Sequence, residues 1–327
     1  MSASSADLHR GSSPSGAPRA PTAKGRHIHY MHDDQLQWPA ESALKGADVP
    51  TIRIDSWAQF RALIDGGAFR SWGFRGQTHA DWGLWTALSR HLRYAGVHPA
   101  AWARQEERIL RVFKRKAHLW LDPQPAEGNS FEWLALMQHH GAPTRLLDMT
   151  WSPYVALFFA LDRGGPTSAV WAFNVARINQ MPVTLRDGRT VDVAPASIRE
   201  EGSFEEFFLR QSLPFVVIGE PHAMHRRLVA QSSTFLVPSV LDRSIEAILA
   251  GYAGEPLVTR LELDTAAMRA EALQALYLMN ITAASLFPDL DGLGRSLAYE
   301  LEWHWAFDPR TLEARPGFAP PAGLWEG

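Results

Sequence analysis

One short helical segment, apolar on every side, constrains the fold of this 327-residue chain more than any other feature. Pro153 is tolerated in the first turn of a helix, and Ser152 before it is a favourable N-cap residue. Residues 155–161 then read VALFFAL and offer no polar face to solvent. A helix without a polar face is stable only where other elements cover it. The sequence therefore predicts that this helix lies in the interior of a globular protein.

The composition also indicates a packed globule. Hydrophobic residues make up 46% of the chain and charged residues 20%, which excludes wholesale disorder, collagen-like repeats and coiled coil. No run approaches the roughly 18 uninterrupted apolar residues of a membrane span, so we expect no membrane partner. Cysteine is absent, which excludes disulfides, thiolate metal sites and cysteine nucleophiles and is compatible with the cytoplasm, where we expect the protein. The net charge of −3 gives no global attraction to nucleic acid, although a local basic patch could provide one.

The composition changes at both ends of the chain. Residues 1–47 are rich in Ser, Ala, Pro and Gly and cannot bury enough apolar surface to offset their ordering entropy, so we expect a flexible N-terminal tail. This stretch has no apolar core of the kind a secretory signal needs. Residues 309–327 are rich in Pro and Gly and are expected to form a C-terminal tail. One main domain is expected over residues 48–308.

Within this domain, helical and extended patterns alternate irregularly. Trp57, Phe60, Leu63 and Ile64 recur at helical spacing after the N-cap signal at Ser56. The expected helices span 57–64, 98–121, 130–139, 153–161, 244–250, 266–278 and 292–305. The expected strands span 51–54, 72–75, 145–149, 168–175, 214–219, 234–237 and 257–263. Because this order lacks regular βαβ periodicity, the sequence predicts an α+β fold with a mixed or antiparallel sheet and packed helices.

The segment from Gly73 to Gln77, read as GFRGQ, is the first candidate for chemistry. A strand that ends in Arg75 between glycines leaves the backbone bare, so that a flat ligand or a phosphate could approach closely. The guanidinium could then bind that ligand through two parallel donors. The alternative is an arginine paired with a core carboxylate beside a tight turn.

The second candidate is the stretch QHHGAPTRLLDMTWSP at residues 138–153. A helix is expected to end at Gly141, and Thr150 and Ser152 fall where hydroxyls cap the next helix. Free amides and the positive end of the helix dipole make such a position an anion site, and plain capping without a ligand is the alternative. His139 and His140 point in different directions and have no thiolate companions, so no metal is expected.

Gln231 and a line of arginines each allow a binding role or a purely structural one. Gln231, within residues 226–238, could hydrogen-bond a base or an amide, or it could satisfy the backbone of a loop. A line of arginines on the helix at 98–121 could bind nucleic-acid phosphates or could be an ordinary solvated face, and Glu106 and Glu107 dilute its charge. These arginines are Arg104, Arg108, Arg111 and Arg115.

Taken together, these segments resemble the FRG domain family, named for a Phe/Tyr-Arg-Gly motif. The stretches FRGQ, QHHGAPTRLLDMTWSPYVALFFA, RRLVAQSSTF and SLFPDLDGL occur in the order of the family. The resemblance extends over roughly Asp55 to Leu297.

A second resemblance, to ADP-ribosyltransferases, implies a chemistry and an ADP-ribosyltransferase-like fold. In that family an early strand carries an arginine that holds NAD, which Arg75 resembles. A later strand carries a hydroxyl-x-Ser motif, which Thr150-Trp151-Ser152 resembles, followed by a helix with Ala156 and Phe159 facing inward. The strand at 234–237 resembles the third element. The resemblance implies that NAD is a co-substrate and that these residues contact it: Phe74, Arg75, Gly76, Gln77, His140, Thr144, Arg145, Asp148 and Thr150.

The same resemblance implies a catalytic glutamate on or near the third strand, and none occurs there. Arg75, Ser152 and Gln231 are therefore the expected catalytic residues, with Glu205 or Glu206 as carboxylates that could fold into the site. Glu300 and Glu302 form a Glu-x-Glu pair, but they fall in the last helix. The implied function is ADP-ribosyl transfer to nucleic acid or protein, as in a toxin or a phage-defence effector. The alternative is a non-catalytic module that binds a nucleotide or nucleic acid.

Overall fold

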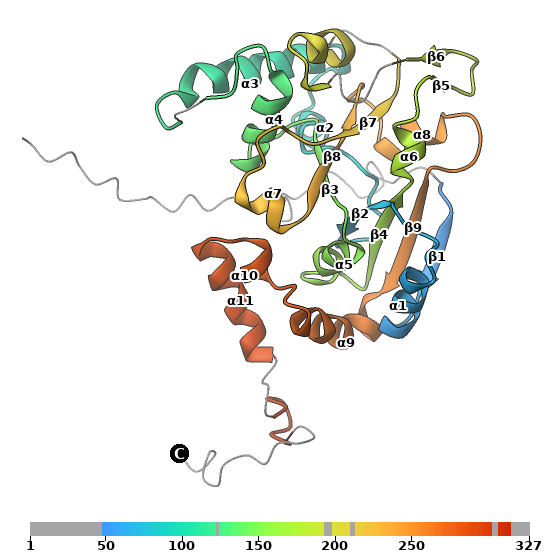
Figure 1. Cartoon of the computed structure of the whole chain (residues 1–327), viewed down its shortest axis with the longest axis vertical. Helices are drawn as coiled ribbons and strands as arrows, with labels where there is room; N and C mark the ends of the chain where they lie inside the picture. The colour runs from blue at the N-terminus through green and yellow to red at the C-terminus, as the bar shows by residue number, and fades with distance from the viewer. Residues whose placement is uncertain (1–47, 122–123, 193–197, 210–212, 303–306, 315–327) are drawn as a thin grey trace, which may run out of the picture. The chain divides into compact units, whose positions relative to one another are not determined.

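The computed structural model describes residues 48–121, 124–192, 198–209, 213–302 and 307–314, and these form helices around a mixed sheet (Figure 1). The α+β class with a mixed sheet is confirmed. The predicted N-terminal tail and most of the predicted C-terminal tail lie outside the described residues. Across the described part of the chain, no helix combines the length and the apolar character needed to cross a membrane.

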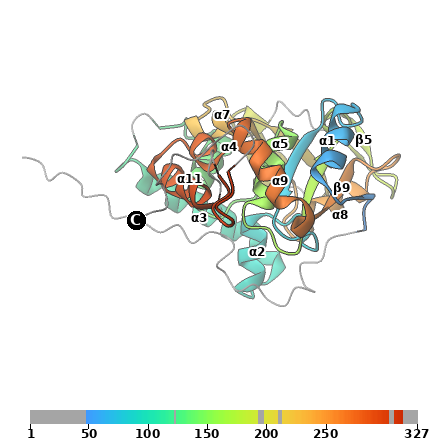
Figure 2. The ribbon, with the colours of Figure 1, turned by 90° about the horizontal axis from the view of Figure 1, so that it is seen from below.

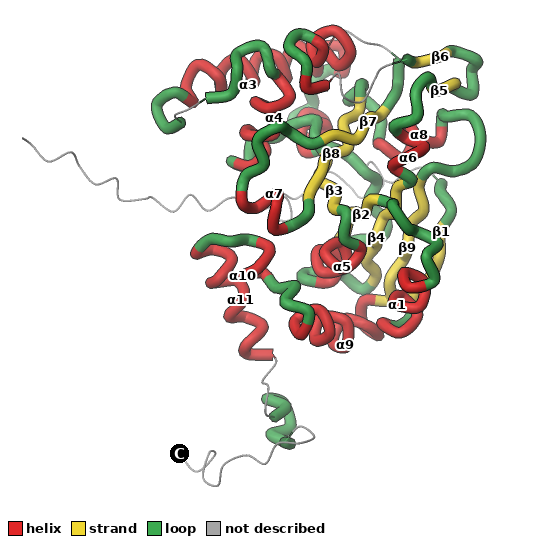
Figure 3. The backbone as a smooth tube through the Cα atoms, in the orientation of Figure 1, coloured by secondary structure: helices red, strands yellow, loops and turns green. Residues whose placement is uncertain are grey.

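Seven strands make up the main sheet (Figure 3). In spatial order they are β1 (Thr51–Ile54), β9 (Val258–Asp264), β4 (Thr167–Phe173), β2 (Gly73–Gln77), β3 (Leu147–Thr150), β8 (Ser233–Pro238) and β7 (Val216–Gly219). The pair β1–β9 is parallel, and the other neighbouring pairs are antiparallel. The short strands β5 (Val183–Thr184) and β6 (Thr190–Val191) pair separately.

The main sheet is nearly divided between β2 and β3. These strands share a single register pair, Phe74 opposite Thr150, whereas β2 pairs with β4 over five residues and β3 pairs with β8 over four. Two half-sheets, β1-β9-β4-β2 and β3-β8-β7, therefore share one register pair. We call the stretch of β2 and β3 that is not paired beyond it the inter-strand gap.

Side-chain caps mark where several of the helices begin. The helices are α1 (Trp57–Asp65), α2 (Ala87–Tyr94), α3 (Trp102–Ala117), α4 (Ser130–His139), α5 (Pro153–Leu161), α6 (Val175–Ile178), α7 (Arg226–Ala230), α8 (Ile245–Ala250), α9 (Thr265–Leu278), α10 (Ala283–Leu286) and α11 (Leu290–Glu302). Asn129 caps α4, because its side chain accepts a hydrogen bond from the amide of Glu132. Ser152 caps α5 through the amide of Val155.

Helix α5 is the interior helix that the sequence predicts. Its residues are buried apart from Tyr154 and Phe159, which are partly exposed, and Pro153 in its first turn. It packs with α1 and α9 on one face of the larger half-sheet (Figures 1 and 2). A second hydrophobic cluster fills the other face of that half-sheet and surrounds β3, β8 and β7.

Several element boundaries differ from the prediction by a few residues, and two of the differences have a clear cause. The helix expected over 98–121 is α3, which begins at Trp102 because a 3-10 turn over Pro99–Ala101 precedes it. The strand expected over 145–149 is β3, which begins at Leu147 because Arg145 is bound inside the core. Helices α2, α6, α7 and α10 were not predicted. Of these, α6, α7 and α10 have only four or five residues, which are too few to show helical periodicity.

Candidate functional site

Arg75 lies on the face of the sheet opposite α5. Phe74 packs in the hydrophobic cluster that contains α5, and a Cβ atom at Gly76 would overlap the carbonyl oxygen of Ala156 in α5. Because side chains alternate along a strand, Arg75 points to the other face. The bare backbone predicted at Gly76 is therefore needed by α5. It does not serve the approach of a ligand from that side.

The Arg75 guanidinium reaches across the inter-strand gap. Its Nη1 donates a hydrogen bond to the backbone carbonyl of Asp148 over 2.7 Å. Arg75 is partly exposed and Asp148 is exposed, and the contact between them is made to the Asp148 backbone. Gln77, also predicted as a ligand contact, is buried, and its amide donates to the carbonyl of Gly83 over 3.3 Å. The structure thus brings Arg75 and Asp148 together.

Thr150, Ser152 and Gln231 meet at a different place, the junction of β3 and α5 with α7 and β8. Thr150 Oγ1 donates to the carbonyl of Gln231 over 2.7 Å and accepts from the amide of Ser152 over 3.1 Å. The Gln231 amide donates to the carbonyl of Leu286 over 3.0 Å. Thr150 and Gln231 are buried at 4% and 6% exposure. Thr150 and Ser152 thus make ordinary capping bonds, and the Gln231 side chain satisfies a backbone carbonyl. Both outcomes are the alternatives that need no ligand.

The three expected catalytic residues therefore do not converge. Arg75 faces away from α5, whereas Ser152 is the N-cap of α5 and uses its hydroxyl oxygen there.

Thr144 and Arg145, expected to contact a cofactor, are enclosed by protein. Arg145 is 1% exposed and pairs with Glu106, which is fully buried. Its Nε donates to Glu106 Oε1 over 2.8 Å, and its Nη1 donates to three backbone carbonyls, those of Phe208, Pro238 and Ser239. Thr144 accepts from the amide of Leu146 over 3.1 Å. Both residues have structural partners. The arginine that pairs with a core carboxylate is therefore Arg145, whereas this pairing was considered for Arg75.

His140 belongs to a cluster that the sequence did not predict. The rings of His139 and His225 are 3.7 Å apart at their centroids, and those of His139 and His140 are 4.8 Å apart. Burial lowers the pKa of His139 and of His225 to about 4, with nearby Arg227 adding to both shifts. His225 Nδ1 accepts a hydrogen bond from the amide of Leu228, as an unprotonated nitrogen must.

This cluster predicts a loss of stability in acid. Both pKa values fall from the ordinary 6.5 to about 4 on folding, so between these pH values the unfolded chain binds protons that the folded chain does not. The free energy of unfolding should therefore decrease as the pH falls from 6.5 to 4 and change little above that window. His139→Phe keeps a ring beside His225 but cannot titrate, so its melting temperature should fall less with pH. Parallel pH profiles for the two proteins would contradict this prediction.

The carboxylate that contacts the Thr150–Ser152 segment is Glu220, which sequence reasoning missed. Its Oε1 accepts a hydrogen bond from the Trp151 indole over 2.8 Å. Glu220 follows β7, and only the strand order β3-β8-β7 brings it near. The carboxylates considered from sequence lie elsewhere, since Glu205 accepts from Ser130 and Glu302 pairs with Arg269.

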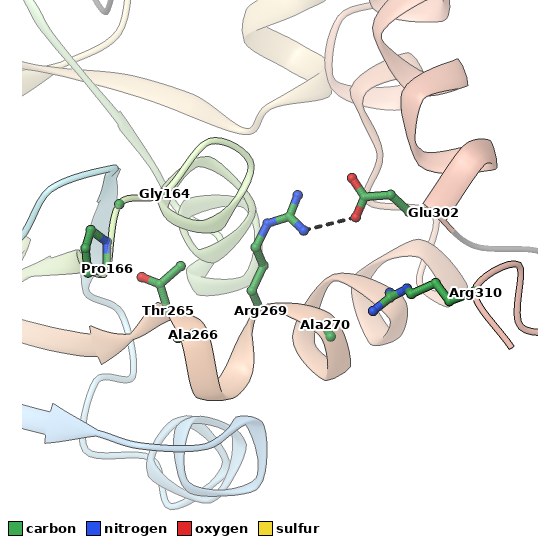
Figure 4. Close-up of a pocket in the computed structure, with 9 residues that line it drawn as sticks. Gly164, Pro166, Thr265, Ala266, Arg269, Ala270, Glu302 and Arg310 are labelled. Atoms are coloured by element: carbon green, nitrogen blue, oxygen red, sulfur yellow. Dashed lines mark hydrogen bonds and ion pairs between the residues drawn. The ribbon is translucent and has the colours of Figure 1, made fainter.

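A cavity of about 480 Å³ lies away from all the predicted site residues (Figure 4). It is lined by α9, the end of α11 and residues 164–166. Figure 4 shows Arg269 extending from α9 to Glu302, and their ion pair measures 3.0 Å. Arg269 Nε also donates to the carbonyl of Leu161 over 3.1 Å. The charges of Arg269 and Glu302 offset one another. Among the described residues, no group of three His, Asp or Glu could hold a metal ion.

The divided sheet with an arginine across its gap defines an α+β domain with a candidate anion site. Residues 70–168 match the family model described as the FRG domain, so the chain contains an FRG domain. The matched residues include β2, α4, β3 and α5, and therefore both rims of the inter-strand gap. The RRLVAQSSTF and SLFPDLDGL stretches lie outside them. No curated protein and no solved structure matches the chain.

Proposed function

We propose that this FRG domain binds a nucleotide at the inter-strand gap and that the nucleotide is NAD. The observation that carries the proposal is the Arg75 guanidinium at the rim of the gap, 2.7 Å from the carbonyl of Asp148. A guanidinium presents its donors in a planar fork that matches a phosphate. Asp148 is exposed, so its carboxylate is open to a bound ligand.

A guanidinium and a carboxylate that both reach one bound ligand would suit ADP-ribosyl transfer. The reaction breaks the bond between nicotinamide and C1′ of the ribose, and the bonding electrons leave with neutral nicotinamide. A nucleophile of the acceptor then bonds to C1′ and loses its proton. Positive charge develops at C1′ meanwhile, so a carboxylate there stabilises the transition state. In this proposal Arg75 holds the diphosphate, Asp148 faces the ribose, and the acceptor is nucleic acid or protein, as for a toxin or defence enzyme.

The test measures NAD binding by calorimetry and nicotinamide release by chromatography. Arg75→Ala should weaken NAD binding by about tenfold or more, because a charge-assisted hydrogen bond contributes about 1.5–3 kcal/mol. Asp148→Asn should retain binding and lower the rate of release by about 10²–10³. Arg53→Ala is the matched control, since Arg53 also projects from a strand and its side chain is 81% exposed. It should behave as the wild type.

Three outcomes separate the alternatives. Nicotinamide release that depends on Arg75 and Asp148 supports the transferase. NAD binding that depends on Arg75, with no release in any acceptor mixture, assigns the non-catalytic binding module. If wild-type protein and Arg75→Ala are indistinguishable in both measurements while both are folded, the nucleotide site at the gap is disproved.

A further inference from the structure

Helix α3 carries a line of arginines on its exposed side. Arg104, Arg108, Arg111 and Arg115 are all exposed, and their spacing of four, three and four residues places them on one face. At about 1.5 Å per residue the line extends over about 16 Å. The opposite side of α3 is fixed to the protein by Trp102, Leu110 and Ala117, which are buried. We call the four arginines the α3 basic face.

One of the two acidic residues that were expected to dilute the charge of this face does not lie on it. Glu106 points inward and pairs with Arg145, so Glu107 is the carboxylate that α3 itself exposes there. Lys114 is also directed away, because its Nζ donates to the carbonyl of Glu127 over 2.7 Å. Among the ion pairs between described residues, none includes a member of the α3 basic face.

The α3 basic face does not stabilise helix α3. Like charges three or four residues apart repel each other on a helix surface. Arg104 also lies in the first turn of α3, where the helix dipole disfavours a positive charge. The six basic residues of α3 contrast with a net charge of −3 for the whole chain. A polyanion that lies along the face would relieve this repulsion.

Beyond the end of α3, an aromatic side chain is directed to solvent. Trp120 is 80% exposed, and Leu119 next to it is 63% exposed. An exposed indole is a stacking platform for nucleobases, and it can be used by a base only where that base is not already stacked in a duplex. Basic side chains followed by an exposed aromatic ring are the combination found in single-strand binding sites.

We propose that the α3 basic face binds the phosphate backbone of single-stranded nucleic acid and that Trp120 stacks on one of its bases. This surface is separate from the inter-strand gap and does not depend on NAD binding there. In Figure 1, α3 lies at the opposite side of the described fold from α1 and β1. Arginines on those two elements therefore serve as controls of equal charge.

The experiment measures fluorescence anisotropy of a short single-stranded oligonucleotide with the full chain. The double variant Arg108→Glu/Arg111→Glu should weaken binding by about tenfold or more, and Arg53→Glu/Arg61→Glu should stay within about twofold of the wild type. For four phosphate contacts, log Kd against log salt concentration should have a slope magnitude of about 3. Trp120→Ala should weaken binding by about fivefold to a hundredfold.

Each other result overturns a stated part of the proposal. Equal losses in the two double variants would show that only net charge matters. A duplex that binds as tightly as the single strand, with no effect of Trp120→Ala, would exclude base stacking. Heparin that binds as tightly as the oligonucleotide would replace nucleic acid by polyanions in general. Absence of binding at low salt would exclude the surface as a nucleic-acid site.

Discussion

Replacing Glu106 by glutamine is expected to lower the free energy of unfolding by about 3–5 kcal/mol, because it leaves a buried guanidinium without its counter-charge. Arg145 is 1% exposed and Glu106 is fully buried, so neither charge can be compensated by water. Guanidinium chloride unfolding, followed by far-ultraviolet circular dichroism, measures the change.

The large effect also reflects how many chain segments this ion pair joins. Glu106 belongs to α3, and Arg145 precedes β3. The same guanidinium donates to the carbonyls of Phe208, Pro238 and Ser239, at 3.0–3.1 Å. These carbonyls are buried with Arg145, so a displaced guanidinium leaves them without a donor, and an unsatisfied buried acceptor costs about 1–3 kcal/mol.

An exposed ion pair provides the matched control. Arg61 and Asp65 are 3.7 Å apart on α1, with side chains 59% and 63% exposed. Asp65→Asn should change the free energy of unfolding by less than about 1 kcal/mol. The double variant Glu106→Met/Arg145→Met leaves no buried charge, but it also removes the donor of three buried carbonyls, so it should not restore the stability of the wild type. Equal effects of Glu106→Gln and Asp65→Asn would contradict the structural role of the buried pair.

Local signals in the sequence predicted the elements whose stabilising bonds are also local. Asn129 and Ser152 each bond an amide three residues further along, so their identity and position suffice to predict where α4 and α5 begin. Glu106 shows the opposite case. Its partner is 39 residues away, and the helical pattern of α3 alone gave a charged residue no reason to face inward.

In the candidate site, too, the sequence predicts the local features of a strand and not its contacts with distant segments. Alternation along β2 fixes Phe74 and Arg75 on opposite faces, but the sequence does not say which face α5 covers. The sequence predicts that the motif GFRGQ lies on a strand, which the structure confirms. It does not predict that α5 packs against Gly76. The single register pair between β2 and β3 is likewise a property of the assembled sheet, and it sets the gap that Arg75 spans.

Gly76→Ala is expected to destabilise the protein by about 3 kcal/mol or more, a large fraction of the roughly 5–15 kcal/mol by which domains are stable. A Cβ atom at this position would overlap the carbonyl oxygen of Ala156 and lie 2.7 Å from the amide nitrogen of Ala160. Both atoms belong to the backbone of α5, so no side-chain rotation can relieve the overlap. Because α5 is covered on almost every side, it cannot shift away from β2 without disturbing the core.

Gly294→Ala in α11 separates this steric effect from the general effect of replacing glycine. A Cβ atom at Gly294 would meet nothing within 4 Å. Alanine should therefore stabilise the helix by about 0.5–1 kcal/mol, through the smaller entropy of the unfolded chain. Denaturant unfolding should give changes of opposite sign for the two variants. A stabilising or neutral Gly76→Ala would mean that α5 does not pack against β2, and the assignment of Arg75 to the opposite face would then fail with it.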